Sequence, residues 1–205
     1  MRRQCLPLLL FWLLAPAAGA QADWEQIRDE DGIQVYSSVV DGNDIIRVKT
    51  RVIIGAPLET IRRILDDAPR RPEWVPWLRQ SRVLRDFGNG QRLEYSHFGA
   101  PWPATDRDFV YRIQSRSQNP RQRIFSMQSE TSPLMPEQAD KIRAELIESV
   151  YTLSALGPAR TRVELVFHAD LRGWLPIWIN NIVQRHLPYR MLKNLRARAE
   201  AEHAG

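Results

Sequence analysis

The sequence predicts an α+β domain in which a curved antiparallel sheet carries one long helix across it. Two observations lead to this fold class. Segments in which apolar and polar residues alternate occupy most of the chain between residues 33 and 171, which is typical of half-buried strands. Residues 173–201 instead carry an apolar residue at every fourth position, which is typical of an amphipathic helix.

The first twenty residues have the pattern of a secretory signal peptide. Arg2 and Arg3 precede a short apolar run, residues 6–14, and small residues follow at positions 18–20. The apolar run is too short for a good membrane span. We therefore expect a signal peptide at residues 1–20, a mature domain at residues 21–205, and export from the cytoplasm. The compartment would be the periplasm in a Gram-negative bacterium, and otherwise the protein would be secreted.

Composition excludes several classes of function. The one cysteine, Cys5, lies in the predicted signal peptide, so the mature chain has no disulfide, thiol chemistry or thiolate metal site. Without Arg2 and Arg3, the 29 Lys and Arg become 27 against 24 Asp and Glu, roughly +3. The arginines are scattered along strands, unlike the basic stripe of a nucleic-acid-binding protein. We expect no nucleic-acid partner, and a weak attraction to anionic lipid head groups remains open.

Strands follow one another along most of the mature chain, with one helix among them. Asp31-Gly32 is a turn signal, and Pro57 opens a helix that Pro69 and Pro72 end. Gly88-Asn89-Gly90 indicates a hairpin turn. Residues 131–140 contain two prolines and predict a long loop. One expected strand begins at residues 33–36, and the others span residues 45–54, 81–87, 91–98, 108–115, 123–130, 141–156 and 161–171.

The C-terminal helix has a continuous apolar face, formed by Ile179, Val183, Leu187, Met191, Leu195 and Ala199. Pro188 lies inside the pattern, so we expect a kink there or a break into two helices. A helix of this kind needs a concave apolar surface, which the preceding strands can provide. Sheet and helix would form a grip that either closes tightly or encloses a cavity.

Four stretches of the chain agree in order and spacing with one known family. They are Asp31-Gly32-Ile33 with Val35-Tyr36, then Trp74, then Pro101-Trp102-Pro103 leading to Asp106-Arg107-Asp108-Phe109-Val110, and last Met135-Pro136-Glu137-Gln138 with Ile142-Arg143-Ala144-Glu145 and, downstream, Asp170-Leu171-Arg172-Gly173-Trp174-Leu175-Pro176. These stretches resemble the START (steroidogenic acute regulatory protein-related lipid-transfer) domain, which has a helix-grip fold. The likeness covers roughly Trp24 to Ala201.

The resemblance implies a lipid-binding module rather than an enzyme. It implies that the C-terminal helix closes a tunnel lined by the inner face of the sheet, with the loop at residues 131–140 as a second gate. It also implies that Arg107 is an interior polar group, often paired in the family with a carboxylate on a neighbouring strand. This chain has Phe98 where the family members have an acid, so that familiar pair is in doubt here.

Strand alternation selects the residues expected to face a ligand. On the strand that begins at Arg107, the more apolar side carries Arg107, Phe109 and Tyr111. The other candidates are Tyr95, His97, Leu146, Glu148, Val150, Leu165 and Phe167 from the sheet, with Ile179, Val183 and Leu187 from the helix. For each of them the alternative is ordinary core packing. For Arg107 the alternative is a tie between strands that never meets a ligand.

A buried guanidinium needs a partner, because an unpaired buried charge costs several kcal/mol. Glu148 is the first candidate for the partner of Arg107, since it is expected on the same face as Leu146 and Val150. Glu94 and Asp106 are the alternatives.

Sequence motifs for catalysis are absent. No nucleophile elbow, zinc-binding helix, phosphate loop or dinucleotide fingerprint occurs, and the histidines have no metal-ligand spacing. We therefore expect a monomer that binds a hydrophobic small molecule or lipid without a cofactor, in transient contact with a membrane. Two alternatives stay open. One is an aromatase/cyclase-like or hydrolytic enzyme using His97 with a carboxylate, and the other is a protein-interaction module with a filled core.

Overall fold

The computed structural model describes residues 23–205, so the predicted signal peptide lies outside the described residues. In chain order the elements are β1 (Glu25–Glu30), β2 (Ile33–Val40), β3 (Asn43–Ile54), α1 (Leu58–Asp66), the short 3₁₀ helix η1 (Arg71–Glu73), β4 (Leu78–Gly88), β5 (Gln91–Phe98), β6 (Asp106–Asn119), β7 (Gln122–Ser129), β8 (Lys141–Arg143), β9 (Glu145–Gly157), β10 (Arg160–Asp170) and α2 (Ile177–Ala204).

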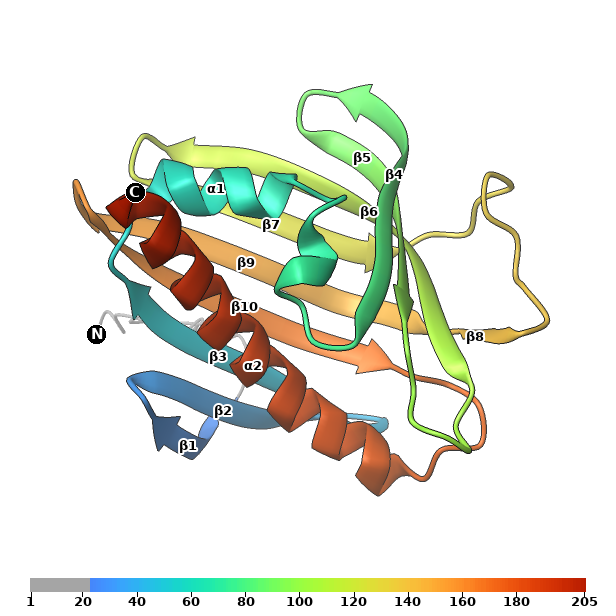
Figure 1. The fold of residues 1–205 in the computed structure, drawn as a ribbon. Coiled ribbons are helices and arrows are strands. Elements are labelled where there is room, and N and C mark those ends of the chain that lie inside the picture. The colour runs from blue at the N-terminus through green and yellow to red at the C-terminus, as the bar shows by residue number, and fades with distance from the viewer. Residues whose placement is uncertain (1–22) are drawn as a thin grey trace, which may run out of the picture.

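The strands form one curved sheet, with neighbours in the order β1-β2-β3-β10-β9-β7-β6-β5-β4. All of these neighbours are antiparallel, and β8 lies off this path and pairs in parallel with the start of β6. Both helices lie on the same face of the sheet, and α2 crosses it diagonally (Figure 1). Helix α2 contacts β2, β3, β10 and α1. The predicted α+β fold, a curved sheet with one long C-terminal helix across it, is confirmed.

Two predicted elements differ from the structure. The strand expected at residues 141–156 is divided into β8 and β9, because the chain changes its partner there: β8 pairs with β6, and β9 pairs with β10 and β7. At the division Ala144 donates its N–H to the carbonyl of Asp108, and Arg143 binds the Asp108 carboxylate at 2.8 Å. Of the kink or break expected at Pro188, the break is absent, because α2 continues through it from Ile177 to Ala204. Leu187, Pro188 and Tyr189 are all buried, so packing on both sides of the proline offsets the lost backbone hydrogen bond.

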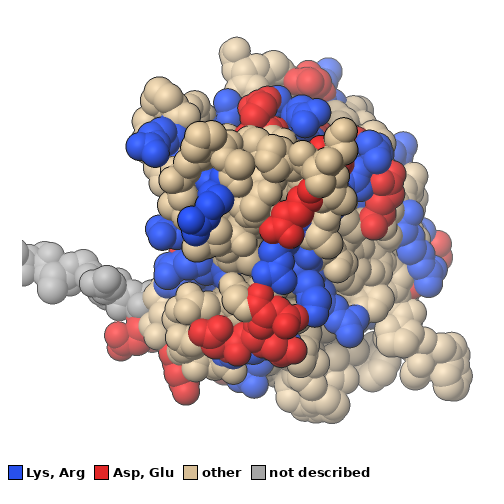
Figure 2. All heavy atoms as spheres, turned by 60° about the vertical axis from the view of Figure 1, so that its left-hand side comes forward, with Lys and Arg blue, Asp and Glu red and all other residues tan. Residues whose placement is uncertain are grey.

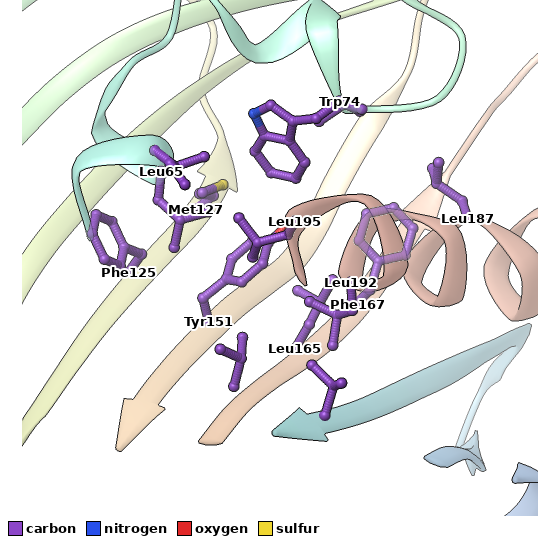
Figure 3. Packing of buried hydrophobic residues seen from close by; sticks show 14 of the residues in the cluster. Leu65, Trp74, Phe125, Met127, Tyr151, Leu165, Phe167, Leu187, Leu192 and Leu195 are labelled. Atoms are coloured by element: carbon purple, nitrogen blue, oxygen red, sulfur yellow. The ribbon is translucent and has the colours of Figure 1, made fainter. Parts of the chain in front are cut away.

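The main core lies between the sheet, α1 and the C-terminal part of α2 (Figure 3). Leu165 from β10 and Tyr151 from β9 meet Leu192 and Leu195 of α2 there, and Leu65 comes from α1. Burying a leucine of this kind contributes about 1.5–3 kcal/mol. The core therefore fixes one end of the helix firmly to the sheet.

A second, smaller apolar cluster lies on the opposite face of the sheet. Met135, from the loop at residues 131–140, packs there on Leu93, Tyr95 and Val110. The loop predicted at these residues is confirmed, and it covers the outer face of β5 and β6.

Within residues 23–205, no helix is both long enough and apolar enough to cross a bilayer.

Candidate functional site

A cavity of about 840 Å³ lies between the inner face of the sheet and α2. The residues around it are mostly apolar, and they come from η1, the strands β4, β5, β6, β7, β9 and β10, the helices and the loops between them. Trp77, Trp102 and Trp174 border the cavity and are also exposed, by 49%, 93% and 64%. The cavity therefore opens to solvent between the β5–β6 loop, residues 99–105, and the segment that leads into α2. We call this opening the mouth.

Eight of the thirteen predicted ligand contacts border this cavity. They are Arg107, Phe109, Tyr111, Leu146, Phe167, Ile179, Val183 and Leu187. Alternation along β6 and β10 and the four-residue repeat of α2 were therefore sufficient to predict most of the side chains that share this cavity. That they contact a ligand stays a prediction.

Tyr95 and His97 lie on the other face of the sheet. Tyr95 is the cross-strand partner of Val110, whose side chain points away from Phe109 and Tyr111, and it is buried under Met135. On β5 the inner face carries Glu94 and Ser96 instead, because buried polar partners there satisfy them. We expected Tyr95 and His97 to face inward because their side of β5 is the more apolar one. In the structure that apolar side is the outer face of the sheet, covered by Met135.

Glu148 and Val150 also point away from the cavity. A register shift between His168 and Ala169 places an extra residue of β9 between Leu146 and Glu148, and such a bulge reverses the alternation that follows. Glu148 consequently pairs with Arg47 at 2.7 Å. Leu165 does face inward, but it is fully buried in the core and does not border the cavity.

Arg107 is buried at the mouth, and its guanidinium binds backbone carbonyls. Nε donates to the carbonyl oxygen of Leu171 at 3.3 Å and Nη2 to that of Arg172 at 3.4 Å, while Nη1 donates to Thr105. Burial lowers the pKa of Arg107, and the charge of Asp106 acts in the opposite direction. Within residues 23–205 no carboxylate lies within ion-pair distance of it, so the prediction of Glu148, Glu94 or Asp106 as its partner was wrong.

The buried ion pair inside the domain involves Arg71, which sequence reasoning missed. Its guanidinium lies 2.5 Å from Glu94 and 2.9 Å from the Tyr111 hydroxyl, and it donates to the carbonyl of Leu65. Burial raises the pKa of Tyr111 to about 12. Burial alone would lower the pKa of Arg71, but Tyr111 and Glu94 raise it above its ordinary value. Arg71 and Tyr111 border the cavity, so this cluster is a polar patch in its wall.

His97 does have a carboxylate partner, at the base of the β5–β6 loop. Its Nε2 lies 2.7 Å from Asp106, which also accepts hydrogen bonds from Arg79 and from the backbone N–H of Ala100. The N–H of Ala100 lowers the pKa of Asp106, with His97 and Arg79 adding to the effect. These hydrogen bonds join the two ends of the β5–β6 loop. His97 does not border the cavity. Among residues 23–205, no group of His, Cys, Asp or Glu side chains could hold a metal ion.

The loop at residues 131–140 does not border the cavity, although the resemblance implied that it is a gate. Met135 fixes it to the outer face of the sheet instead. The β5–β6 loop occupies the mouth in its place.

A curved sheet gripped by one long C-terminal helix defines the helix-grip class of fold. Within that class, the chain belongs to the START domain family, whose model matches residues 12–204. The resemblance inferred from the motifs is thereby confirmed.

Known proteins of this family align over most of the chain. The mitochondrial steroidogenic acute regulatory protein of Gallus gallus is 30% identical over 189 residues, which cover 88% of this chain and 66% of that protein. Human STARD10 has the same fold, with a TM-score of 0.81 at 21% identity over 88% of this chain and 74% of that one. So does a STAR-related lipid transfer protein from Xanthomonas axonopodis, with a TM-score of 0.77 at 24% identity over 86% and 98% of the two chains.

Proposed function

We propose that the protein binds one lipid in the cavity between the sheet and α2 and carries it between membranes. The observation that carries the proposal is the cavity of about 840 Å³, whose walls are mostly apolar. Its size is within the range of about 300–1,000 Å³ that is usual for pockets of small ligands. An unfilled space this large counts against a protein-interaction module with a filled core. A related bacterial protein of the same fold is named for lipid transfer.

The predicted contacts give the ligand an orientation. Phe109, Phe167 and Val183 supply apolar surface, and burial of apolar area stabilises the complex by about 25 cal/mol per Å² before ordering costs. Arg107 is at the mouth and Arg71 is in the wall of the cavity. Either guanidinium can offer a hydrogen bond to the polar head of a lipid that stays inside the protein.

We propose binding rather than catalysis. The histidine–carboxylate pair that an enzyme could use, His97 with Asp106, is outside the cavity and holds a loop. Arg107 and Arg71 cannot act as general bases, because a guanidinium keeps its proton.

The test is native mass spectrometry of protein purified without detergent, followed by organic extraction. We expect one lipid per chain. Val183→Trp would fill the cavity from α2 and abolish the bound mass, whereas Ile182→Trp, at an exposed position of the same helix, would retain it. Wild-type protein that carries nothing and takes up no lipid from a mixed panel would refute the proposal.

We further propose that the mouth is the surface that contacts the membrane. Trp102 and Trp174 are exposed beside it, and Trp178 is exposed one helical turn further on. Residues 171–199 carry six Lys and Arg and no Asp or Glu. Arg172, Lys193 and Arg198 are paired with acids from other segments, whereas Arg190 lies over the ring of Trp77 at the mouth, 5.5 Å from its centroid. Tryptophan with basic residues is typical of surfaces that lie at a bilayer interface. Elsewhere, acidic and basic side chains are interspersed on the face drawn in Figure 2.

Flotation with liposomes tests this surface. We expect more binding to vesicles of phosphatidylglycerol and phosphatidylcholine than to phosphatidylcholine alone, and a loss of binding in Trp102→Ala. Phe87→Ala, which removes an exposed ring from the β4–β5 hairpin, is the matched control. Equal loss in both variants would contradict the assignment.

Export and a monomeric state complete the proposal. Intact mass of the protein from the periplasmic fraction should correspond to a chain that begins near Gln21, and light scattering should give one chain per particle. A chain that retains residues 1–20 would contradict export.

A further inference from the structure

Two neighbouring hairpin ends of the sheet carry basic side chains and no acidic ones. They are the end of the β6–β7 hairpin, residues 115–123, and the end of the β9–β10 hairpin, residues 154–163. We call them the distal turns. Neither contains an Asp or Glu, and together they carry Arg116, Arg121, Arg123, Arg160 and Arg162.

The distal turns lie side by side. The N–H of Ala155 donates to the carbonyl of Arg121 at 2.8 Å, and Gln122 of β7 is the cross-strand partner of Ser154 of β9. Arg123 is half-buried, with Nη1 donating to the hydroxyl of Ser115 at 3.1 Å, and the other four arginines are exposed. The two turns therefore present one positively charged surface.

The charge of this surface is not neutralised by the protein. In the part of the chain that the structure describes, none of the five arginines has a carboxylate within ion-pair distance, and the acids nearest in the chain and in space are already paired. Glu164 pairs with Arg51 at 2.7 Å, and Glu59 pairs with Arg62 at 2.5 Å. Arg62 lowers the pKa of Glu59 most, and Arg123 adds a smaller effect.

The unpaired charge is large for this chain. Residues 21–205 carry 27 Lys and Arg against 24 Asp and Glu, an excess of three. Five unpaired arginines on two turns exceed that figure, so the net charge of the domain is concentrated there. In Figure 2, the upper left part of the view shows Lys and Arg without Asp or Glu, and acidic side chains appear elsewhere in the view.

The distal turns lie at the opposite end of the sheet from the mouth (Figure 1). Strand β6 begins at Asp106, beside the mouth, and its 14 residues end at Asn119 in a distal turn. At a rise of about 3.3 Å per residue, the strand separates the two ends by roughly 40 Å along its length. A flat surface that touches the mouth therefore cannot touch the distal turns as well.

The chemistry of the distal turns suits a plane of phosphate groups better than a protein partner. Leu156, 38% exposed, is the large apolar side chain exposed on them, and a protein interface needs an apolar core. Guanidinium groups bind phosphate oxygens through two parallel hydrogen bonds. An anionic bilayer attracts basic residues without any fitted shape.

We propose that the distal turns dock on the anionic head groups of a second membrane while the mouth faces the first. The protein would then bridge two bilayers across the length of its sheet. The contact depends on charge alone and is screened by salt, so one chain is held weakly and many chains between two membranes act together. For its purpose the inference rests on the proposed carriage of a lipid between membranes, but its test needs no bound lipid.

Vesicle capture tests the distal turns separately from the mouth. Residues 21–205 contain no cysteine, so Trp102→Cys adds a single exposed thiol at the mouth, which couples the chain to phosphatidylcholine vesicles that bear maleimide. We expect the coated vesicles to capture fluorescent vesicles of phosphatidylglycerol and phosphatidylcholine, and not vesicles of phosphatidylcholine alone. Rising salt should reduce the capture.

Three double variants in the Trp102→Cys chain locate the contact. Arg121→Ser with Arg160→Ser should weaken capture by about 25-fold or more, because each basic residue near an anionic bilayer strengthens binding about fivefold. Arg121→Lys with Arg160→Lys keeps both charges and should retain capture. The matched control is Arg82→Ser with Arg185→Ser, which removes two exposed arginines of β4 and α2 and should change capture less than about twofold.

The proposal is overturned if the coated vesicles capture nothing, or if the control variant loses as much as Arg121→Ser with Arg160→Ser. Capture of fluorescent polyglutamate but not of anionic vesicles would assign the turns to an acidic protein and overturn it too. Native mass spectrometry of the same chain keeps the two proposals apart. A chain without lipid that captures anionic vesicles refutes lipid carriage alone, and a loaded chain that captures none refutes bridging alone.

Discussion

Glu94 should be among the residues on which stability depends most, because it neutralises a buried guanidinium. Its carboxylate is fully buried and lies 2.5 Å from Arg71, whose side chain is 7% exposed. Glu94→Gln keeps the shape and one acceptor but leaves Arg71 without a full counter-charge. Arg92, which also pairs with Glu94, keeps its second partner, Asp66. Removing one partner of a buried pair costs about 3–5 kcal/mol.

Urea unfolding at neutral pH measures this cost. Thermal unfolding is the second readout: for a domain of this length each kcal/mol lowers Tm by about 2–4 °C, so Glu94→Gln should lower Tm by about 6–20 °C. Glu164→Gln is the control, because Glu164 pairs with Arg51 at 2.7 Å near the surface and should lose about 0–1 kcal/mol.

Replacing both partners separates charge from packing. Arg71→Met with Glu94→Leu removes both buried charges and should regain most of the loss. The reasoning is refuted if Glu94→Gln lies within about 1 kcal/mol of the wild-type protein.

Two further predictions concern pH and backbone geometry. Burial lowers the pKa of His168 from 6.5, so its contribution to stability is complete above that pH and is lost as pH falls below it. The difference in unfolding free energy between the wild-type protein and His168→Gln should therefore shrink from about pH 7.5 to about pH 5, and parallel profiles would contradict the assignment. Gly90 has φ 75° and its Cβ would meet the carbonyl of Ser115, so Gly90→Ala should cost about 1–3 kcal/mol in the same assay. Gly99→Ala meets the flexible end of Arg79 and should cost less than about 1 kcal/mol, so equal losses would refute this contrast.

The fold was predictable because each element has a strong local pattern. The strand at residues 45–54 alternates strictly, and the C-terminal helix repeats an apolar residue at every fourth position. In such elements, periodicity alone shows which side chains share the inner face. The inner faces of β6 and of α2 were therefore found correctly.

The faces of β5 and β9 were not predictable in the same way. On β5 the inner residues Glu94 and Ser96 are polar, and nothing local to the strand indicates that Arg71 will neutralise Glu94. On β9 the bulge after Leu146 reverses the alternation, and no glycine or proline marks it in the sequence. A buried arginine from a proline-rich connection has no periodic context, so Arg71 could be found only in three dimensions.

The sheet ends in an open edge at β4, which has consequences for the behaviour of the protein at high concentration. An exposed edge strand can recruit a strand from another molecule and begin aggregation. Here the pairing of β4 with β5 is irregular at three places, and such irregularities twist an edge away from straight pairing. Arg79, Arg82 and Arg85 also project from β4 at three-residue intervals and are exposed, so two copies of this edge would repel each other. The protein can therefore leave this edge of the sheet open, beside a cavity, without β4 serving as a template for fibres.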